Sequence, residues 1–185
     1  MAATSTPWGL SQSEHERIPG VIFYSTASHG GVRLSIARQA EFRRVFPDWS
    51  GWIGGCEWFE EDCDAVLPAL AFASEYDDRA IFYAVRSVKG SPDYFRAILP
   101  WFETEAGRAT VARADSYAAS VADQWEVGSM STLLPGDYGL TRDEARGLWN
   151  VHLFRSDGAA GWFLMPYPER EFYTDAEVSR FRKAA

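Results

Sequence analysis

The chain has 185 residues, of which 46% are hydrophobic, and it carries 26 acidic against 18 basic side chains for a net charge of −8. This length fits one domain over residues 1–185, and so many apolar side chains exclude a disordered chain. The net negative charge disfavours direct nucleic-acid binding, because such binding depends on neutralising phosphates. Every apolar run falls short of the roughly 18 residues that a membrane-spanning helix needs, which excludes a membrane partner.

The first half of the chain alternates turn signals with apolar runs. In order, the predicted elements are an extended or partly ordered N-terminal segment (1–17), a β-hairpin (18–35), a helix (35–45), an aromatic-pinned loop (48–55) and helices over 60–72 and 77–88. Ser35 supplies a capping side chain for the first helix. The acids that follow Glu60 suit the positive end of a helix dipole, and Pro68 is expected to kink or end that helix.

The second half predicts a short helix over 94–99, a long helix over 104–125, a loop over 128–139, and strands over 149–155 and 161–165. Thr174 and Glu177 have the spacing of a capping box at the start of a last helix. Together these elements predict an α+β fold in a single domain. Antiparallel β-hairpins near both ends of the chain would share one sheet, packed with a mainly helical middle.

Nine acids and no Lys, Arg or His lie in the segment 46–78, which leaves 17 acids against 18 bases in the rest of the chain. The nine are Asp48, Glu57, Glu60, Glu61, Asp62, Asp64, Glu75, Asp77 and Asp78. A local field of this kind can steer a basic partner or bind a cation. The basic residues just before the segment are Arg33, Arg38, Arg43 and Arg44. Mutual compensation between these two neighbours is the simplest explanation of both.

His29 is the first candidate for chemistry. It follows Ser28 and precedes Gly30-Gly31, at the tip or exit of the predicted hairpin. An exposed imidazole beside hydroxyls and open backbone amides could transfer a proton or bind an anion. The alternative is an ordinary turn, in which glycines allow positive φ and polar side chains bond their own backbone. Turn chemistry accounts for every residue here except His29.

The carboxylates of the predicted second helix are the other candidates. On a helix, Glu57, Glu61 and Asp64 would share one face and could ligate a hard cation, or provide an acid and a base. With His29 and Ser28, Glu61 is therefore a candidate catalytic residue. The sequence carries no cofactor motif beyond this potential divalent-metal site. The alternatives are a solvated helix start and an acidic docking face.

A docking face would combine these acids with neighbouring tryptophans. Its candidate binding residues are Trp49, Trp52, Trp58, Glu57, Glu60, Glu61, Asp62 and Asp64. Exposed aromatics mark interfaces, although core packing is the commoner role of such residues. The two cysteines, Cys56 and Cys63, are expected to be free thiols, and residues 1–6 lack the features of a signal peptide, so we expect a cytoplasmic protein. A Cys63–His29 nucleophile pair is disfavoured, because Asp62 and Asp64 would raise the thiol pKa.

Four segments together resemble an uncharacterised bacterial family. They are TPWG (6–9), YSTASHGG (24–31), WFEEDCD (58–64) and LAF (70–72). The family is known only as a domain of unknown function, frequent on plasmids and in phages, and the resemblance covers roughly the first 75 residues. It implies a cytoplasmic accessory protein of a mobile genetic element and supplies no catalytic residues.

Two functions follow from these observations, and a third possibility is a purely structural or regulatory module in which His29→Ala would be silent. The first is an accessory protein whose acidic, aromatic face binds a basic protein surface, such as that of a host defence or nucleic-acid-processing protein. The alternative is a small hydrolase or transferase in which His29 acts with the carboxylates of Glu57 to Asp64, with or without a metal. The alternative requires His29 to lie within about 10 Å of those carboxylates, because proton relay needs hydrogen-bond reach. The oligomeric state does not follow from the sequence.

Overall fold

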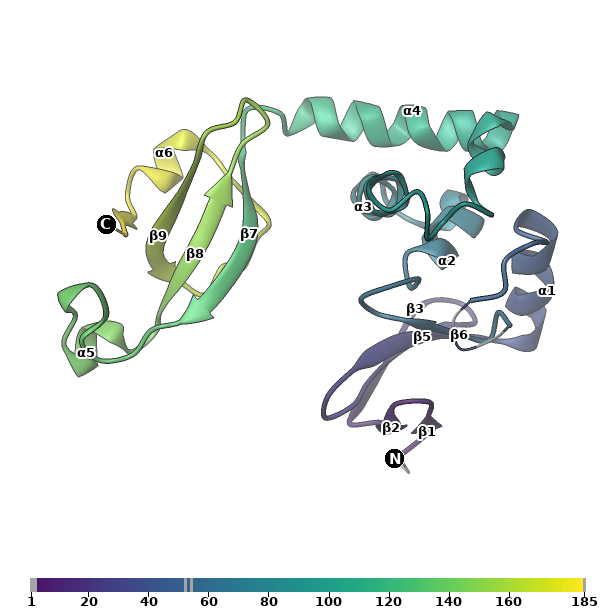
Figure 1. The fold of residues 1–185 in the computed structure, drawn as a ribbon, viewed down its shortest axis with the longest axis horizontal. Coiled ribbons are helices and arrows are strands. Elements are labelled where there is room, and N and C mark those ends of the chain that lie inside the picture. Colours follow the sequence, from purple (N-terminus) through teal and green to yellow (C-terminus); the bar gives the residue numbers. More distant parts are fainter. Residues whose placement is uncertain (1–2, 52, 54, 185) are drawn as a thin grey trace. The chain divides into compact units, whose positions relative to one another are not determined.

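A computed structural model of the chain describes residues 3–51, 53 and 55–184 (Figure 1). The chain divides into two compact units, residues 1–117 and residues 118–185. Antiparallel sheets lie towards both ends of the sequence and helices occupy its middle, so the predicted α+β class is confirmed. That residues 1–185 behave as one domain stays a prediction. No helix in the described part of the chain is both long and apolar enough to cross a bilayer.

The described residues of unit 1 form six strands and most of the helices. The strands are β1 (Ser5–Thr6), β2 (Gly9–Leu10), β3 (Ser13–Ile18), β4 (Val21–Ser25), β5 (Gly30–Leu34) and β6 (Trp58–Glu60). The helices are α1 (Ile36–Val45), α2 (Leu67–Ala71), α3 (Asp78–Gly90) and α4 (Glu105–Ser120), which ends just past the unit boundary, with the 3-10 helices η1 (Ala73–Glu75) and η2 (Leu99–Glu103). Strands β3 to β6 form an antiparallel sheet in the order β3-β4-β5-β6.

Local signals set several of these elements as expected. The Ser35 side chain accepts a hydrogen bond from the Arg38 N–H and caps α1. Asp77 caps α3 in the same way through the Ala80 N–H, at 2.8 Å. The hairpin of β4 and β5 is also confirmed. The N-terminal segment is more regular than expected, because β3 pairs with β4 along residues 13–18.

The predicted helix over 60–72 is wrong. Glu60 ends strand β6, residues 61–66 form turns, and α2 begins only at Leu67, with Pro68 in its first turn. Proline is well placed there, since the first turn of a helix does not use its N–H groups. Two other helix limits also differ from the predictions. Residues 92–98 form turns before η2, and α4 ends before β7 starts at Trp125.

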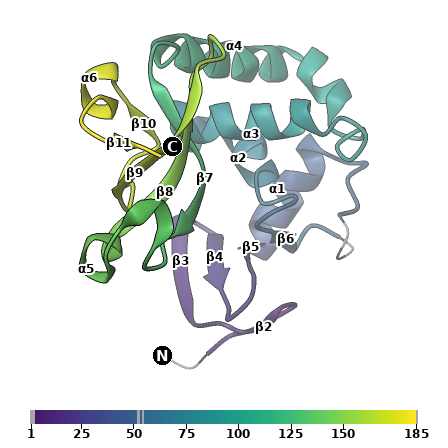
Figure 2. The same ribbon diagram turned by 60° about the vertical axis from the view of Figure 1, so that its left-hand side comes forward.

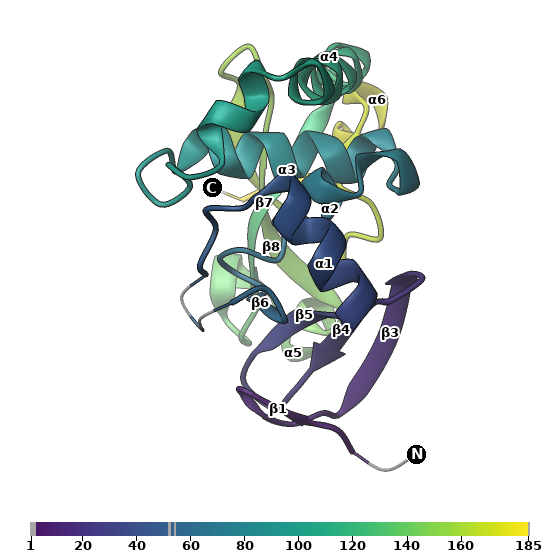
Figure 3. The ribbon, with the colours of Figure 1, turned by 90° about the vertical axis from the view of Figure 1, so that its right-hand side faces the viewer.

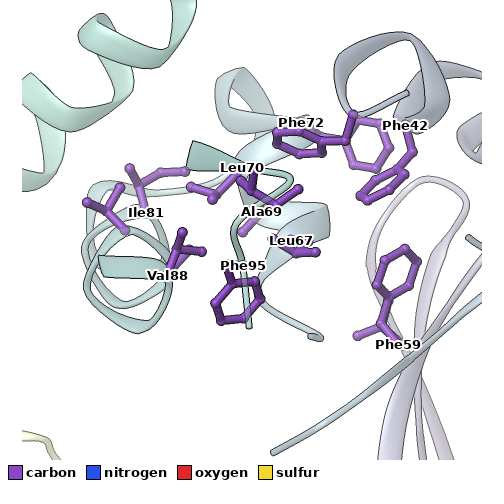
Figure 4. Packing of buried hydrophobic residues seen from close by; sticks show 14 of the residues in the cluster. Phe42, Phe59, Leu67, Ala69, Leu70, Phe72, Ile81, Val88 and Phe95 are labelled. Carbon is purple, nitrogen blue, oxygen red and sulfur yellow. The ribbon is translucent and has the colours of Figure 1, made fainter. Parts of the chain in front are cut away.

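The core of unit 1 holds β6 against the helices. Figure 4 shows Phe59 of β6 facing Phe42 of α1, with ring centroids 4.9 Å apart. Leu67 of α2 and Ile81 of α3 are fully buried in the same cluster. Figure 3 shows α1 and α2 between the sheet and α3. Full burial of each such side chain contributes roughly 1.5–3 kcal/mol, so the short strand β6 is firmly anchored.

Unit 2 is built on a five-stranded antiparallel sheet (Figure 2). Its elements are β7 (Trp125–Thr132), β8 (Leu148–Phe154), β9 (Ala160–Pro166), β10 (Phe172–Tyr173), β11 (Arg182–Lys183), α5 (Arg142–Ala145), α6 (Asp175–Val178) and the 3-10 helix η3 (Asp137–Gly139). The strand order is β10-β7-β8-β9-β11. The predicted pair of strands, here β8 and β9, is confirmed, while residues 128–132 of the predicted 128–139 loop belong to β7.

The prediction that one sheet joins the two ends of the chain is wrong. Among the described residues, the N-terminal hairpin and the C-terminal hairpin belong to different sheets. The hairpins themselves follow from local alternation and turn residues, whereas the pairing of distant strands depends on long-range register. Each hairpin instead recruits neighbours from its own part of the sequence.

Replacing Thr174 by alanine should lower the stability of unit 2. Thr174 and Glu177 form the predicted capping box, in which the Thr174 N–H donates to Glu177 Oε2 at 2.8 Å and Thr174 Oγ1 accepts from the Glu177 N–H at 3.4 Å. Loss of such a cap costs about 1 kcal/mol, which for a unit of this size corresponds to a melting temperature lower by about 4–8 °C. Thermal unfolding followed by circular dichroism measures this shift. Thr174→Ser keeps the hydroxyl and should melt like the wild type; equal loss in both variants would contradict the cap.

Candidate functional site

A short turn between β4 and β5 presents His29. The Thr26 N–H donates to the His29 carbonyl at 2.7 Å, and the Thr26 hydroxyl donates to the same oxygen at 2.7 Å. In return Thr26 Oγ1 accepts from the His29 N–H at 3.2 Å and from the Ser28 N–H at 3.5 Å. The backbone of the predicted turn is therefore fixed by Thr26. The His29 side chain is left free of that task and is 53% exposed.

Pairing of β5 with β6 brings this histidine to the acidic residues. Gly31 lies opposite Glu60 in the register, and the Glu61 N–H donates to the Gly30 carbonyl at 3.1 Å. Because β5 starts directly after His29, the imidazole emerges where β6 ends. His29 Nδ1 lies 3.6 Å from Glu60 Oε1, within ion-pair reach when the imidazole is protonated. The structure thus meets the distance condition that the enzyme hypothesis set.

Four side chains converge at this point and form what we call the His29 cluster: His29, Glu60, Glu61 and Asp62. One ligand-type atom from each residue lies within 4.8 Å of the others. Glu60 is buried, and the other three are exposed. Of the candidates named from sequence, His29, Glu60, Glu61 and Asp62 are brought together. Ser28 remains an exposed turn residue whose backbone N–H completes the Thr26 contacts.

The two glycines of the hairpin serve close approach, which corrects the expectation of positive φ. Neither Gly30 nor Gly31 has a left-handed backbone. A Cβ on Gly30 would lie 2.4 Å from Glu61 Oε2, so the absent side chain leaves room for that carboxylate. A Cβ on Gly31 would lie 2.1 Å from the Trp8 ring. Trp8 was not among the sequence candidates; its place in the quoted TPWG segment was the signal available.

Glu60 is the buried member of the cluster, with a side chain only 6% exposed. Its Oε2 accepts from the Asp62 N–H at 3.0 Å. A buried carboxylate is costly unless a cation or several donors compensate its charge. Among the described residues, His29 is the basic side chain in ion-pair reach of Glu60. The cluster therefore has one fixed, desolvated carboxylate and two exposed ones facing an imidazole.

Asp64, a metal-ligand candidate from the sequence, lies outside the His29 cluster and holds the backbone of Glu60. It is 1% exposed, and its Oδ1 accepts the Glu60 N–H at 2.6 Å. Burial raises its pKa from 3.8 to about 6, against the lowering effect of hydrogen bonds from the Glu60 and Asp64 N–H groups. Asp64 is not part of the convergent set. Because the Asp64 carboxylate accepts the Glu60 N–H, it positions the backbone of the turn.

Cys63 lies in the same turn as a free thiol, and Cys56 is a buried free thiol, as expected. Burial raises the pKa of the Cys63 thiol to about 11, and the neighbouring carboxylates, Glu60 foremost, add to the rise. The thiol is therefore protonated at neutral pH, and a thiolate nucleophile needs the opposite environment. The expectation that acidic flanks would raise this pKa is confirmed.

Glu57 also departs from its predicted place among the metal ligands. It precedes β6 and binds Arg33 in an ion pair at 2.9 Å, because no helix aligns it with Glu61. Other acids of the segment are engaged as well: Glu75 binds Arg38 at 2.6 Å, Asp78 binds Arg113 at 2.7 Å, and Asp77 caps α3. The expected compensation by Arg33 and Arg38 is confirmed. The negative charge of the segment that these contacts leave uncompensated is therefore concentrated at Asp48 and in the His29 cluster.

The tryptophans named for a binding platform pack mainly within unit 1. Trp58 contacts Trp8 edge-on at 5.8 Å, with the Arg33 guanidinium over its ring. Trp49 stacks on Phe95 at 5.9 Å and packs against the core. Trp52 lies outside the described residues. The tryptophans described here therefore serve mainly to pack unit 1, and Trp49 also lines a groove.

The donor set fits a divalent cation. Imidazole nitrogen suits Zn²⁺, Fe²⁺ and related metals, whereas carboxylate oxygen also suits Mg²⁺, Ca²⁺ and Mn²⁺. A mixed set of one imidazole and three carboxylates matches Mn²⁺, Fe²⁺ or Zn²⁺ better than the hard cations alone. The same groups could transfer a proton without a metal, because the His29 imidazole faces carboxylates that can accept its proton. The site therefore has acid–base capacity in either case.

Unit 1 is accordingly a small α+β module with a histidine–carboxylate centre at the edge where β5 meets β6. Residues 1–122 match the family model described as a domain of unknown function, DUF7007, and the chain belongs to that family. The match extends well beyond the 75 residues of the sequence resemblance and includes every residue of the His29 cluster. No curated protein and no solved structure matches the chain.

Proposed function

We propose that this chain is a metal-dependent hydrolase whose divalent cation binds at His29, Glu60, Glu61 and Asp62. The convergence of these four side chains within 4.8 Å carries the proposal. The burial of Glu60 supports it, since a desolvated carboxylate gains most from a cation at close range. Asp64 accepts a hydrogen bond from the Glu60 N–H, so the position of the Glu60 backbone is set before any cation binds.

The roles of the residues follow from their exposure. A bound cation would polarise an ester or phosphoryl oxygen and activate water. Glu60 is buried and fixed and would serve as a ligand. Glu61 and Asp62 face solvent, so one of them would also bind the cation while the other takes the proton of the attacking water. That proton then passes to the leaving oxygen, so water is consumed and one ester bond is broken. His29 completes the ligand set from the turn between β4 and β5.

Calorimetric titration with Mn²⁺, Zn²⁺, Mg²⁺ and Ca²⁺ tests the site. We expect Mn²⁺ and Zn²⁺ to bind more tightly than Mg²⁺ and Ca²⁺, because the set contains an imidazole. His29→Gln and Glu61→Gln should each weaken binding at least about 10- to 100-fold, since even outer-sphere changes have effects of that size. Glu57→Gln is the matched control: it removes a nearby carboxylate that binds Arg33, and it should leave affinity unchanged.

Two results would sink the metal site: no cation binding by the wild type, or equal weakening by Glu57→Gln and Glu61→Gln. The hydrolase part needs a separate assay. With Mn²⁺ present, the wild type should release nitrophenol from p-nitrophenyl phosphate or p-nitrophenyl acetate, and Glu61→Gln should not. Metal binding without turnover of either ester would mean that the cation has only a structural role, and it would overturn the hydrolase proposal.

Docking of a basic protein surface remains the second candidate, in the setting of an accessory protein of a mobile genetic element. The exposed acids Asp48, Glu61 and Asp62 support it, whereas the ion pairs of Glu57, Glu75 and Asp78 reduce the field available to a partner. The two candidates respond differently to His29→Gln. That change should weaken cation binding and leave a charge-driven partner bound, while Glu61→Lys with Asp62→Lys should abolish both.

A further inference from the structure

Unit 1 also contains a hollow that is lined by residues outside the His29 cluster. It is a groove of about 300 Å³ between the loop after α1 and the turns before η2. Trp49, Gly51, Tyr94, Arg96 and Asp48 are among the residues that line it. This volume is at the lower end of what small-molecule sites have, roughly 300–1,000 Å³. A ligand the size of one nucleotide is therefore the upper limit for this groove.

Its aromatic walls meet at a corner. The rings of Trp49 and Tyr94 lie 5.8 Å apart at 71°, and Phe95 stacks behind Trp49 at 5.9 Å. Tyr94 is 41% exposed, so the corner faces solvent while Phe95 holds it from below. A planar ring can stack on one wall and meet the edge of the other. The walls thus suit an aromatic ligand rather than an aliphatic one.

The polar groups of the groove are mostly donors. Among the described residues, the buried indole N–H of Trp49 has no hydrogen-bond acceptor. Burial raises the pKa of the Tyr94 phenol to about 12, and the carboxylate of Asp64 adds to the rise, so the hydroxyl keeps its proton. Arg96 is exposed at the groove and adds a cationic fork that matches phosphate geometry. Asp48 is the acceptor that sugar hydroxyls would need.

Asp64 connects the groove to the His29 cluster. A Cβ on Gly51 would lie 3.3 Å from Trp49 Nε1 and 3.4 Å from Asp64 Oδ2. The other oxygen, Asp64 Oδ1, accepts the Glu60 N–H. One carboxylate therefore backs the groove wall and also holds the buried member of the cluster.

We infer that the groove binds a phosphorylated aromatic compound, specifically a nucleoside monophosphate. The base stacks on Trp49 and Tyr94, the phosphate binds Arg96, and the sugar hydroxyls donate to Asp48. The inference rests on the proposed function only in treating this compound as the ester that the cation centre hydrolyses. Recognition by the groove needs no cation. A free mononucleotide is also consistent with the acidity of the chain, which opposes binding of a long polyanion.

Calorimetric titration of the full chain with AMP, GMP, CMP and UMP, in chelator and again with Mn²⁺, tests the inference. At least one of them should bind with a Kd below about 1 mM. Adenosine alone and inorganic phosphate alone should bind at least about tenfold more weakly. Arg96→Gln and Tyr94→Ala should each weaken binding at least about tenfold; both residues are exposed, so the fold should persist. Arg17→Gln, on β3 and outside the groove, should have no effect.

Absence of binding by all four nucleotides in both conditions would overturn the inference. So would binding that Arg96→Gln and Tyr94→Ala leave unchanged. The two proposals fail separately. Mn²⁺ binding that depends on Glu61 without nucleotide binding would leave the cation centre and remove the substrate class. Nucleotide binding that depends on Arg96 without Mn²⁺ binding would leave the groove and remove the metal-dependent hydrolase.

Discussion

Gly31→Ala is expected to destabilise unit 1 by about 3 kcal/mol, at the upper end of what overpacking usually costs. A Cβ at this position would lie 2.1 Å from Trp8 Cη2 and 2.5 Å from the Phe59 carbonyl oxygen. The second contact is with backbone, which cannot move without disturbing the pairing of β5 with β6. Gly31 is also the register partner of Glu60. The same change should therefore weaken cation binding at the His29 cluster.

Urea unfolding followed by circular dichroism, together with Mn²⁺ titration, measures both effects. Gly90→Ala is the matched control, because nothing lies within 4 Å of a Cβ at that position. Alanine is also favoured over glycine in a helix by roughly 1 kcal/mol, so this variant should be neutral or more stable. If Gly31→Ala unfolded at the same urea concentration as the wild type, Trp8 and Phe59 would not be packed against Gly31 as described.

The parts of the fold that could be predicted depend on neighbours in sequence. Ser35 and Asp77 cap their helices and Thr174 pairs with Glu177 within four residues, so local chemistry was sufficient. The acidic residues that follow Trp58 led to the wrong prediction of a helix over 60–72, because such residues are typical of a helix start. In the structure Trp58 pairs with Arg33, 25 positions earlier, and that long-range pairing makes residues 58–60 a strand. Propensity is a weak guide where tertiary contacts decide.

The candidate site shows the same division. His29 and Glu61 could be named from residue type, but only the register of Gly31 with Glu60 places them together. Glu57 and Asp64 were chosen for a helical face that does not form, and they bind Arg33 and the Glu60 backbone instead. Trp8 and Tyr94 were not predicted as site residues, since nothing local distinguishes a site-lining aromatic from a core one.

Asp64→Asn should remove a decline in stability that the wild type shows between about pH 4 and 6. Burial raises the Asp64 pKa from 3.8 to about 6 in the folded chain. At pH 5 the folded state therefore keeps a proton that the unfolded chain has largely released. The stabilisation is fully present below about pH 4 and is lost as the pH rises through about 6; a shift of two units corresponds to at most about 3 kcal/mol.

Urea unfolding of both proteins at intervals of pH, in chelator so that no cation contributes, gives the comparison. The asparagine oxygen can still accept the Glu60 N–H, so the turn should persist and the variant should gain on the wild type above pH 6. Asp157→Asn is the control: hydrogen bonding to Arg155 lowers the Asp157 pKa to about 2, so its profile should run parallel to the wild type in this window. Parallel profiles for Asp64→Asn and the wild type would contradict the raised pKa. If the Asp64→Asn profile is flat, the Asp64 carboxyl, rather than the residues of the His29 cluster, limits the stability of unit 1 at neutral pH.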